Sequence, residues 1–362
     1  MSSLLLMALL LRCAHSVRLF PTHRRHPLSR SSLSLALSST ASPPGQGPVS
    51  SGDVLLQGLN EAQDISVKVV SCRELVQENI FRNDLSTVAG KALGEVMTSA
   101  LMMGAGLKGE TLQVNIVGDP SFPGLRNVLV ITDGELKVRG KVGEPRFYHP
   151  DPDSASTREL FGDVGQVQVV RNHPSYKNPI NGVTALRDAK LALNLAFYMA
   201  ESEQKPAVLI TDVRVDGNLC RSALGLMVER LPGAAEENVE RSIKNLEQVE
   251  RRGLYSYLHR EDIERTIDSE DKMFRDFEPC LNKILDDCLE GLGEGIRWSK
   301  VPTFKCSCSV DRVWGALALL PKSELEDLVN TVPAVEMKCD FCGINYSIPR
   351  DDVIERLLSP LQ

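Results

Sequence analysis

Four cysteines near the C-terminus, arranged in two close pairs, constrain this chain more than any other sequence feature. One residue separates Cys306 from Cys308, and two residues separate Cys339 from Cys342. Four thiolates form a common ligand set of structural zinc sites, in which Zn²⁺ is held tetrahedrally. Gly343 follows the second pair, and glycine permits the positive φ that such a tight turn often needs. The pattern predicts that all four cysteines bind one Zn²⁺ per chain.

These residues alone leave three interpretations open. The cysteines are four buried free thiols, or they hold a permanent zinc ion with a purely structural role, or they form a redox switch. Zinc keeps sulfur as thiolate, and thiolates react with oxidants much faster than thiols do, so neighbouring cysteines could form disulfides and release the metal. Since zinc binding supplies much of the folding free energy of small domains, loss of the metal could unfold this one.

The residues around the cysteines form longer motifs. They are Phe304–Cys308, Arg312–Leu317, Leu319–Pro321, Glu324–Leu328 and Val335–Gly343. Together these motifs resemble the zinc centre of the heat shock protein 33 family, whose members are redox-regulated holdase chaperones, and the family has two short helices between its cysteine pairs. Further stretches resemble the same family, namely Gln113–Pro120, Asn181–Val183, Tyr198–Gln204 and Leu231–Ala234. The resemblance therefore covers roughly residues 53–350.

The resemblance implies an ATP-independent holdase that is zinc-bound and inactive when reduced, and that binds unfolding proteins after oxidation. It implies that oxidation forms the disulfides Cys306–Cys308 and Cys339–Cys342 and releases zinc. It also implies a homodimer in the activated form. Two other classes are weighed against it: a static zinc-ribbon adaptor or nucleic-acid module, and an enzyme with an unrecognised site.

Composition limits these alternatives. The 362 residues suffice for two or three domains, and the net charge of −7 argues against a nucleic-acid partner, which needs a basic surface. Nine cysteines are too few for a disulfide scaffold and fit a reducing compartment with a metal site. No apolar run reaches the roughly 20 residues of a spanning helix, so we expect no membrane contact in the mature form.

Residues 1–52 have the composition of a targeting leader followed by a linker. They contain no Asp or Glu, but five Arg and twelve Ser. An acid-poor, Arg- and Ser-rich segment is typical of organellar transit peptides, and the apolar run Leu4–Leu11 adds a short signal-like core. We expect import into an organelle, a plastid in preference to a mitochondrion. The alternative without a targeting function is a disordered N-terminal tail.

Residues 53–235 are predicted to form the large domain, in an α+β fold of antiparallel strands and helices. Alternating apolar residues predict strands at 66–70, 111–117, 127–132, 135–141, 164–170, 207–213 and 224–231. Helical spacing predicts helices at 84–103 and 188–203, the first capped by Asp84 or Ser86. Consecutive strands joined by turns indicate a meander rather than repeated βαβ units.

Residues 236–300 are predicted to form a charged helical linker with a thin apolar stripe at Val239, Ile243, Leu246 and Val249. Such a helix is marginal alone and depends on docking. The resemblance implies that the linker is metastable, and we expect the folded zinc domain to offer it a packing surface or at least to restrict it. Cys280 and Cys288 are interpreted as buried free thiols. Residues 301–350 form the expected zinc domain, and residues 351–362 a C-terminal tail.

No catalytic constellation is apparent, and we expect no enzyme. Glu201 and Glu203, two positions apart on a helix, point to different sides and are interpreted as solvated surface residues. His149, His173 and His259 have no Ser or Cys nucleophile at a recognisable motif spacing. Neither a Walker loop nor a dinucleotide fingerprint occurs in the sequence.

Overall fold

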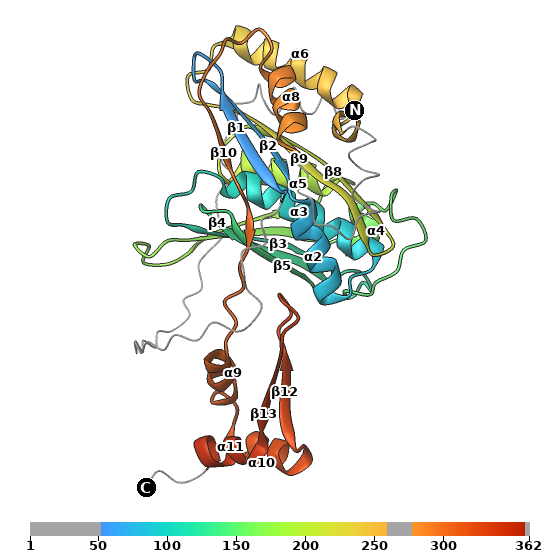
Figure 1. Ribbon diagram of the computed structural model, residues 1–362, viewed down its shortest axis with the longest axis vertical. Coiled ribbons are helices and arrows are strands. Elements are labelled where there is room, and N and C mark those ends of the chain that lie inside the picture. The colour runs from blue at the N-terminus through green and yellow to red at the C-terminus, as the bar shows by residue number, and fades with distance from the viewer. Residues whose placement is uncertain (1–51, 259–276, 359–362) are drawn as a thin grey trace.

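Two mainly antiparallel sheets enclose a layer of helices in the computed structural model, which describes residues 52–258 and 277–358 (Figure 1). A second helical layer covers the outer face of the first sheet, and a C-terminal unit lies beyond the second sheet. The fold is α+β, as the sequence predicts. Nearly all of the expected leader and the central part of the charged linker lie outside the described residues.

The first sheet has five strands, and apolar side chains are buried on both of its faces. In spatial order the strands are β10 (Arg297–Lys300), β1 (Val54–Leu59), β2 (Ile65–Ser71), β9 (Leu219–Arg230) and β8 (Ala207–Asp216). All pairings are antiparallel. Every residue of β2 is buried, because this central strand is covered by helices on both faces.

The second sheet has six strands and one buried face. In spatial order the strands are β11 (Thr303–Phe304), β5 (Lys137–Val142), β4 (Asn127–Asp133), β3 (Thr111–Val117), β6 (Gln166–Asn172) and β7 (Ile180–Ala185). Strands β3, β4 and β5 alternate between buried and partly exposed residues, as a sheet with one covered face should. The predicted meander is confirmed, and only β11 pairs in parallel.

Three helices fill the space between the sheets: α2 (Arg73–Asn83), α3 (Thr87–Gly104) and α5 (Leu191–Ser202). The side chain of Ser86 accepts a hydrogen bond from the Ala89 N–H and caps α3, which selects Ser86 over Asp84 as the expected cap. Helix α2 is capped from elsewhere in the chain, because the buried Asp53 accepts the N–H groups of Glu74 and Leu75. A short helix, α4 (Thr157–Phe161), precedes β6.

Helices α6 (Glu236–Arg252) and α8 (Glu278–Leu289) cover the outer face of the first sheet, with the short helix η1 (Leu254–Tyr257) between them in sequence. The predicted apolar stripe of α6 is buried there. It belongs to one hydrophobic cluster with α8 and with the sheet residues Val54, Leu56, Ile65, Val67, Val69, Val208, Leu224, Leu226 and Val228. Each fully buried aliphatic side chain contributes about 2 kcal/mol, so the stripe is a main source of docking free energy.

Polar contacts fix the start of α6 to the loop between β1 and β2. Asp64 accepts hydrogen bonds from the Ala235 N–H at 2.9 Å and from the Asn238 side chain at 2.9 Å. Burial raises the pKa of Asp64, but these donors and Asn60 outweigh it and hold the pKa below the ordinary value of 3.8. The contribution of the charged carboxylate is therefore complete above that ordinary value and is lost as the pH falls through the lowered one.

The C-terminal unit has its own small hydrophobic core. It consists of α9 (Val310–Leu317), α10 (Lys322–Thr331), β12 (Ala334–Lys338), β13 (Asn345–Pro349), α11 (Arg350–Val353) and η2 (Ile354–Leu358). The two helices between the cysteine pairs are present as expected. The core consists of Val313, Leu317, Leu325, Val329, Val335, Ile348 and Val353. So few apolar residues make a weak core, and additional stabilisation is needed.

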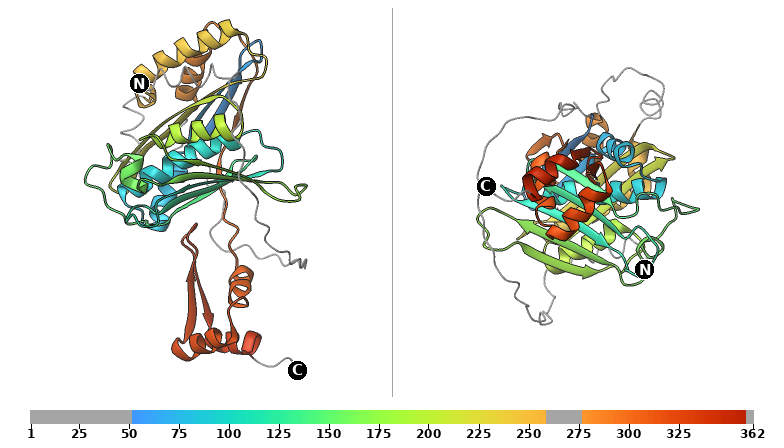
Figure 2. Two further views of the ribbon diagram at one scale, coloured as in Figure 1. Left: turned by 180° about the vertical axis from the view of Figure 1, so that it is seen from behind. Right: turned by 90° about the horizontal axis from the view of Figure 1, so that it is seen from below.

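We expected the zinc domain to offer the linker a surface to pack on, and this expectation is wrong for the described residues. Helices α6 and α8 lie at one end of the molecule and the C-terminal unit at the other, with both sheets between them (Figures 1 and 2). Among the described residues, the hydrophobic cluster that contains α6 includes no side chain beyond Leu292. The apolar stripe showed that α6 must dock, but not that its partner is the first sheet. Among the described residues, the segment 293–305 connects α8 with the cysteine cluster along the chain.

The interpretation of Glu203 as a solvated residue is also wrong. Its side chain is 9% exposed and forms an ion pair with Arg171 of β6 at 2.7 Å. Glu201 does lie on the surface, where it pairs with Arg187. The two glutamates point to different sides of the end of α5, as their spacing predicts, but one of those sides faces the second sheet.

Candidate metal centre

The second cysteine pair lies in the tight turn that joins β12 to β13. The Cys339 N–H donates to the carbonyl of Ile344 at 2.9 Å, and the Gly343 N–H donates to the carbonyl of Cys339 at 2.8 Å. Gly343 has a φ of +71°, and a Cβ there would come within 2.4 Å of the Arg82 carbonyl oxygen. Glycine is thus required both for the turn and for its approach to α2.

The first pair directly follows β11. The Lys305 N–H donates to the carbonyl of Val138 at 3.0 Å, which places Cys306 at the edge of the second sheet. Helix α9 begins just after Cys308, where the Ser309 hydroxyl accepts the Arg312 N–H and caps the helix. A strand end and a helix start therefore position the two thiols.

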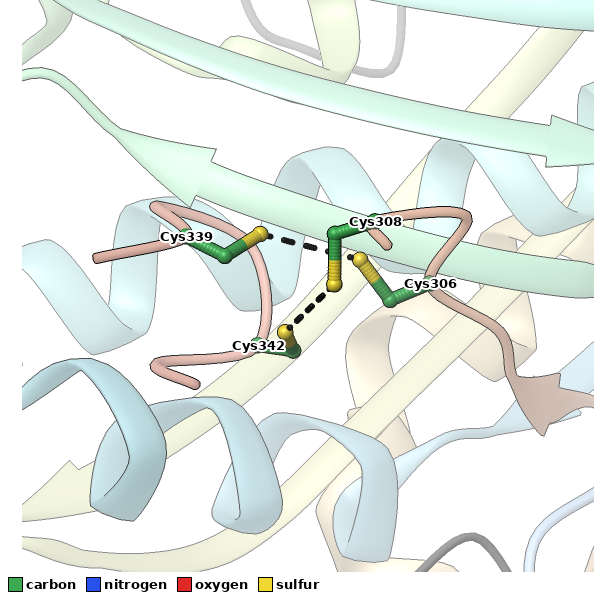
Figure 3. Close-up of side chains that lie close together, drawn as sticks. All are labelled: Cys306, Cys308, Cys339 and Cys342. Atoms are coloured by element: carbon green, nitrogen blue, oxygen red, sulfur yellow. Dashed lines mark hydrogen bonds between the residues drawn. The ribbon is translucent and has the colours of Figure 1, made fainter. Parts of the chain in front are cut away.

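The four sulfur atoms converge, as Figure 3 shows, and all lie within 4.8 Å of one another. Cys306 Sγ is 3.8 Å from Cys339 Sγ, and Cys308 Sγ is 3.3 Å from Cys342 Sγ. Tetrahedral zinc with Zn–S bonds of about 2.3 Å separates its sulfur ligands by about 3.8 Å. The donor set and its spacing fit one Zn²⁺, with each cysteine pair supplying two ligands.

The environment of the thiols is uneven. Burial raises the pKa of Cys306 and of Cys342. Burial also opposes ionisation of Cys308, but hydrogen bonds from the Tyr346 hydroxyl, at 3.1 Å, and from the other thiols outweigh it, and the pKa of Cys308 lies below its ordinary value. Without a cation the cluster does not hold four thiolates together, whereas a bound Zn²⁺ stabilises all of them.

The sulfurs can be reached from outside. A cavity of about 250 Å³ adjoins the cluster and is lined by Cys306, Cys308 and Cys339, together with Ser307, Arg312, Met337, Phe341 and Tyr346. Cys308 and Cys339 are partly exposed, while Cys306 and Cys342 are buried. A small oxidant therefore has access to the cluster without prior unfolding.

Basic residues of the large domain hold the Cys339–Cys342 turn. The Arg139 guanidinium lies 4.8 Å and the Lys141 ammonium 5.5 Å from the centre of the Phe341 ring. Lys141 also pairs with Asp340 at 2.9 Å, and the Asn83 side chain donates to the Phe341 carbonyl at 3.3 Å. The cluster is therefore docked on β5 and on the C-terminal end of α2.

Sequence reasoning missed these docking residues and Tyr346. Arg139 and Lys141 alternate with buried residues on β5, which indicates only that they lie on the outer face of the sheet. Tyr346 is four residues from Cys342, and the antiparallel pairing of β13 with β12 turns it toward Cys308. No local pattern identifies such partners, because they meet through tertiary structure.

The remaining described cysteines are buried in apolar surroundings, as expected for Cys280 and Cys288. Cys72 and Cys220 lie in the core between the sheets, and burial raises the pKa of Cys220 to about 12. Cys280 and Cys288 lie on α8, packed toward the first sheet, and burial raises the pKa of Cys288. Protonated, buried thiols react slowly, so oxidation is directed to the four-cysteine cluster.

The residues considered for catalysis are not brought together. His149 bonds within its own exposed loop, and His173 contacts Ser175 in an exposed turn between β6 and β7. A separate cavity of about 390 Å³ lies between α3, α5 and β8, and it contains neither histidine. His259 lies outside the described residues. In the parts of the chain that the structure describes, no helix is long and apolar enough to cross a membrane.

Comparisons with known proteins agree with this architecture. The sequence model of a family described as "Hsp33 protein" matches residues 53–349. A "33 kDa chaperonin" of Desulforamulus reducens is 29% identical over 316 residues, which cover 83% of this chain and 96% of the relative. The "33 kDa chaperonin" of a Nostoc species is 30% identical over 304 residues, which cover 81% and 91%.

A solved structure shares the fold. It is the crystal structure of the 33 kDa chaperonin, a heat shock protein 33 homolog, of Thermotoga maritima. The TM-score is 0.67 at 24% identity, and the match covers 85% of this chain and 98% of that one. The shared fold thus extends over nearly the whole of the solved chain.

The metal content provides the first test of the site. We predict about one zinc per chain in the reduced protein, since four sulfurs are arranged for one ion. Replacing any one of Cys306, Cys308, Cys339 or Cys342 by Ser should weaken zinc retention by tenfold or more, roughly the loss of one ligand. Cys72→Ser is the matched control. Zinc content by atomic emission checks this, and equal loss from the Cys72 variant would disprove the assignment.

Proposed function

The chain belongs to the Hsp33 family, and we propose from this that it is a redox-regulated, ATP-independent holdase chaperone that binds unfolding proteins under oxidative stress. The observation that carries the proposal is the convergence of four cysteine sulfurs within 4.8 Å of one another, beside an open cavity. Such a cluster supports both tight zinc binding and rapid thiol oxidation. The relatives are named chaperonins, and we propose no enzymatic activity.

In the reduced state, Cys306, Cys308, Cys339 and Cys342 hold zinc and the protein is inactive. Bound Zn²⁺ supplies a cross-link between β11 and the β12–β13 turn and keeps the sulfurs as thiolates. The seven-residue core of the C-terminal unit is small, so this cross-link provides much of its stability. The basic docking residues Arg139 and Lys141 then hold the turn against β5.

Oxidation converts the cluster to disulfides. We propose the pairs Cys306–Cys308 and Cys339–Cys342, which the family resemblance implies. Each disulfide forms as two thiolates give two electrons to an oxidant such as hydrogen peroxide, which leaves as two waters after taking up two protons. The sulfurs then lose their negative charge, and zinc is released. The C-terminal unit loses its cross-link and unfolds.

Unfolding of this unit frees the linker and opens binding surface. Residues 293–305 connect α8 with the cluster through β10 and β11, so release of the cluster removes one fixed end of this segment. Helices α6 and α8 then leave the first sheet, and its outer apolar side chains become exposed. A contiguous apolar surface of this kind binds unfolding clients and also favours a homodimer of the activated form.

Client protection with and without oxidant tests the proposal. The reduced protein, without its leader, should leave a thermally unfolding client to aggregate, because its apolar sheet is covered. The peroxide-treated protein should suppress aggregation at equimolar ratio without ATP and should have released its zinc. Peptide mapping of the same sample should show the two local disulfides. Zinc retention after oxidation, with no protection, would point to a static zinc adaptor.

Loosening the linker should activate the protein without oxidant. Leu246→Gln together with Val249→Gln places amides in the buried stripe of α6 and should weaken docking by about 3 kcal/mol or more per site. Asp64→Ala removes the anchor of the helix start, with a smaller effect of about 2 kcal/mol. Both variants should retain zinc, expose α6 to protease and protect clients when reduced.

The control uses the exposed face of the same helix. Glu240→Gln together with Lys244→Gln introduces the same side chains where α6 faces solvent. This variant should stay inactive and protease-resistant. A linker that is readily cut while the reduced Leu246/Val249 variant gives no protection would show that linker release is not the switch.

We also propose that residues 1–52 direct the protein to an organelle, a plastid in preference to a mitochondrion. The absence of acidic residues and the abundance of Arg and Ser in this segment support the proposal. A fluorescent reporter fused to residues 1–52 should enter the organelle and lose the leader. A reporter that stays in the cytosol would contradict it.

A further inference from the structure

Strand β11 closes the edge of the second sheet with few interactions. Its two residues pair in parallel with β5, and two further backbone hydrogen bonds hold the segment at this edge: Thr303 N–H to the carbonyl of Leu136, just before β5, and Lys305 N–H to the carbonyl of Val138, both at 3.0 Å. A strand of this length is not stable by itself. An unpaired strand edge is a template for another extended chain.

The edge includes a place for one aromatic side chain. Phe304 packs partly buried against the core between the sheets, and the Arg82 guanidinium lies 4.9 Å from the centre of its ring. The segment before it, by contrast, is exposed at Val301. Phe304 therefore acts as the anchor of β11.

The four-cysteine cluster keeps β11 in place. Lys305, whose N–H donates to Val138, is directly followed by Cys306. Cys306 Sγ lies 3.8 Å from Cys339 Sγ, and the Cys339–Cys342 turn is docked on the outer face of β5 by Lys141 and on the end of α2 by Asn83. One end of β11 is thus fixed to β5 twice, by its own pairing and through the cluster.

The surroundings of the edge are mainly basic. Lys137, Arg139 and Lys141 occupy the outer face of β5, where Lys141 pairs with Asp340, and Arg82 lies beside the anchor, paired with Glu78. The nearby Glu135 is paired with Lys300 at 3.1 Å. The strand that now occupies the edge is flanked by Lys300 and Lys305, so its own charges do not complement those of β5.

We infer that the edge of β5 is a client-docking site that β11 blocks in the reduced protein. The occupant after oxidation is an extended segment of an unfolding protein, which adds as a strand to β5 with an aromatic residue in the place of Phe304 and acidic residues beside it. The occupancy of the edge by β11 shows that an extended segment fits there. The inference rests on the proposed chaperone function, and the site is separate from the apolar face under α6 and α8.

The probe is a fluorescein-labelled peptide of residues 299–305 in which both lysines are replaced by glutamate. Fluorescence anisotropy should show negligible binding to the reduced, zinc-loaded protein and clear binding after oxidation. The peptide with its original lysines should bind about tenfold more weakly, because the attraction to β5 is lost. N-methylation at the Thr303 amide removes one backbone donor and should weaken binding about fivefold.

Variants of the protein test the same edge without oxidant. Phe304→Ala removes the anchor of β11. The reduced variant should therefore bind the probe with about tenfold higher affinity than the reduced wild type. Val301→Ala is the matched control, since Val301 is exposed nearby and packs against no core. In the oxidised protein, Lys137→Glu should weaken binding of the acidic probe several-fold, whereas Lys108→Glu, with the same change of charge on an exposed loop, should not.

The site of binding is mapped by replacing the peptide phenylalanine with the photo-crosslinker benzoylphenylalanine. Crosslinks in oxidised wild-type protein should fall on β5 or α2, and this measurement does not depend on the folding of any variant. Crosslinks confined to β1, β2 or β9 would overturn the inference. An oxidised protein that protects clients but does not bind the probe also overturns it and leaves the chaperone function intact. Probe binding at β5 without client protection would instead refute the function.

Discussion

The structure depends on the convergence of four sulfur atoms from two segments of the chain. In the sequence, α9, α10 and β12 separate these segments. Cys306 and Cys308 follow a strand of the large domain, whereas Cys339 and Cys342 form the tip of the β12–β13 turn. Their convergence joins the small unit to the large domain at one point. With zinc bound, four thiolates and one Zn²⁺ carry a net charge of about −2, which the neighbouring Arg139 and Lys141 complement. In the proposed switch, oxidation and zinc release would remove that charge, so the same chemical step would weaken both the cross-link and the docking.

The layered arrangement separates the four-cysteine cluster from the apolar sheet surface that we propose it controls. The cluster touches the second sheet, while α6 and α8 cover the first sheet at the opposite end. The connection between them is the segment with β10 and β11, which lies at the edge of each sheet in turn. In the described parts of the chain, the linker helices and the C-terminal unit belong to separate hydrophobic clusters, so the proposed switch relies on this backbone connection.

Much of the fold is predictable from local patterns. The period-two alternation of β3, β4 and β5 and the capping of α3 by Ser86 are local features, and both are confirmed. The convergence of the four cysteines is also predictable, because pair spacing is set by the geometry of the metal. Helix α2 was not expected, since its cap is Asp53, far away in the sequence. The burial of Glu203 against Arg171 and the docking of α6 on the first sheet depend likewise on which elements meet, and a stripe of apolar residues does not name its partner.

The direction in which β11 is attached decides how it can leave. The Lys305 bond to Val138 lies next to Cys306, and the Thr303 bond to Leu136 lies one step further from the cluster. If β11 separates from β5 starting at Cys306, the Lys305 bond therefore breaks first and the Thr303 bond second, and the two do not have to break together. Peeling in sequence has a much lower barrier than shearing the strand along its axis. In the proposed switch, the segment would therefore open quickly when the cluster is lost and close again from the same end when the thiols are reduced.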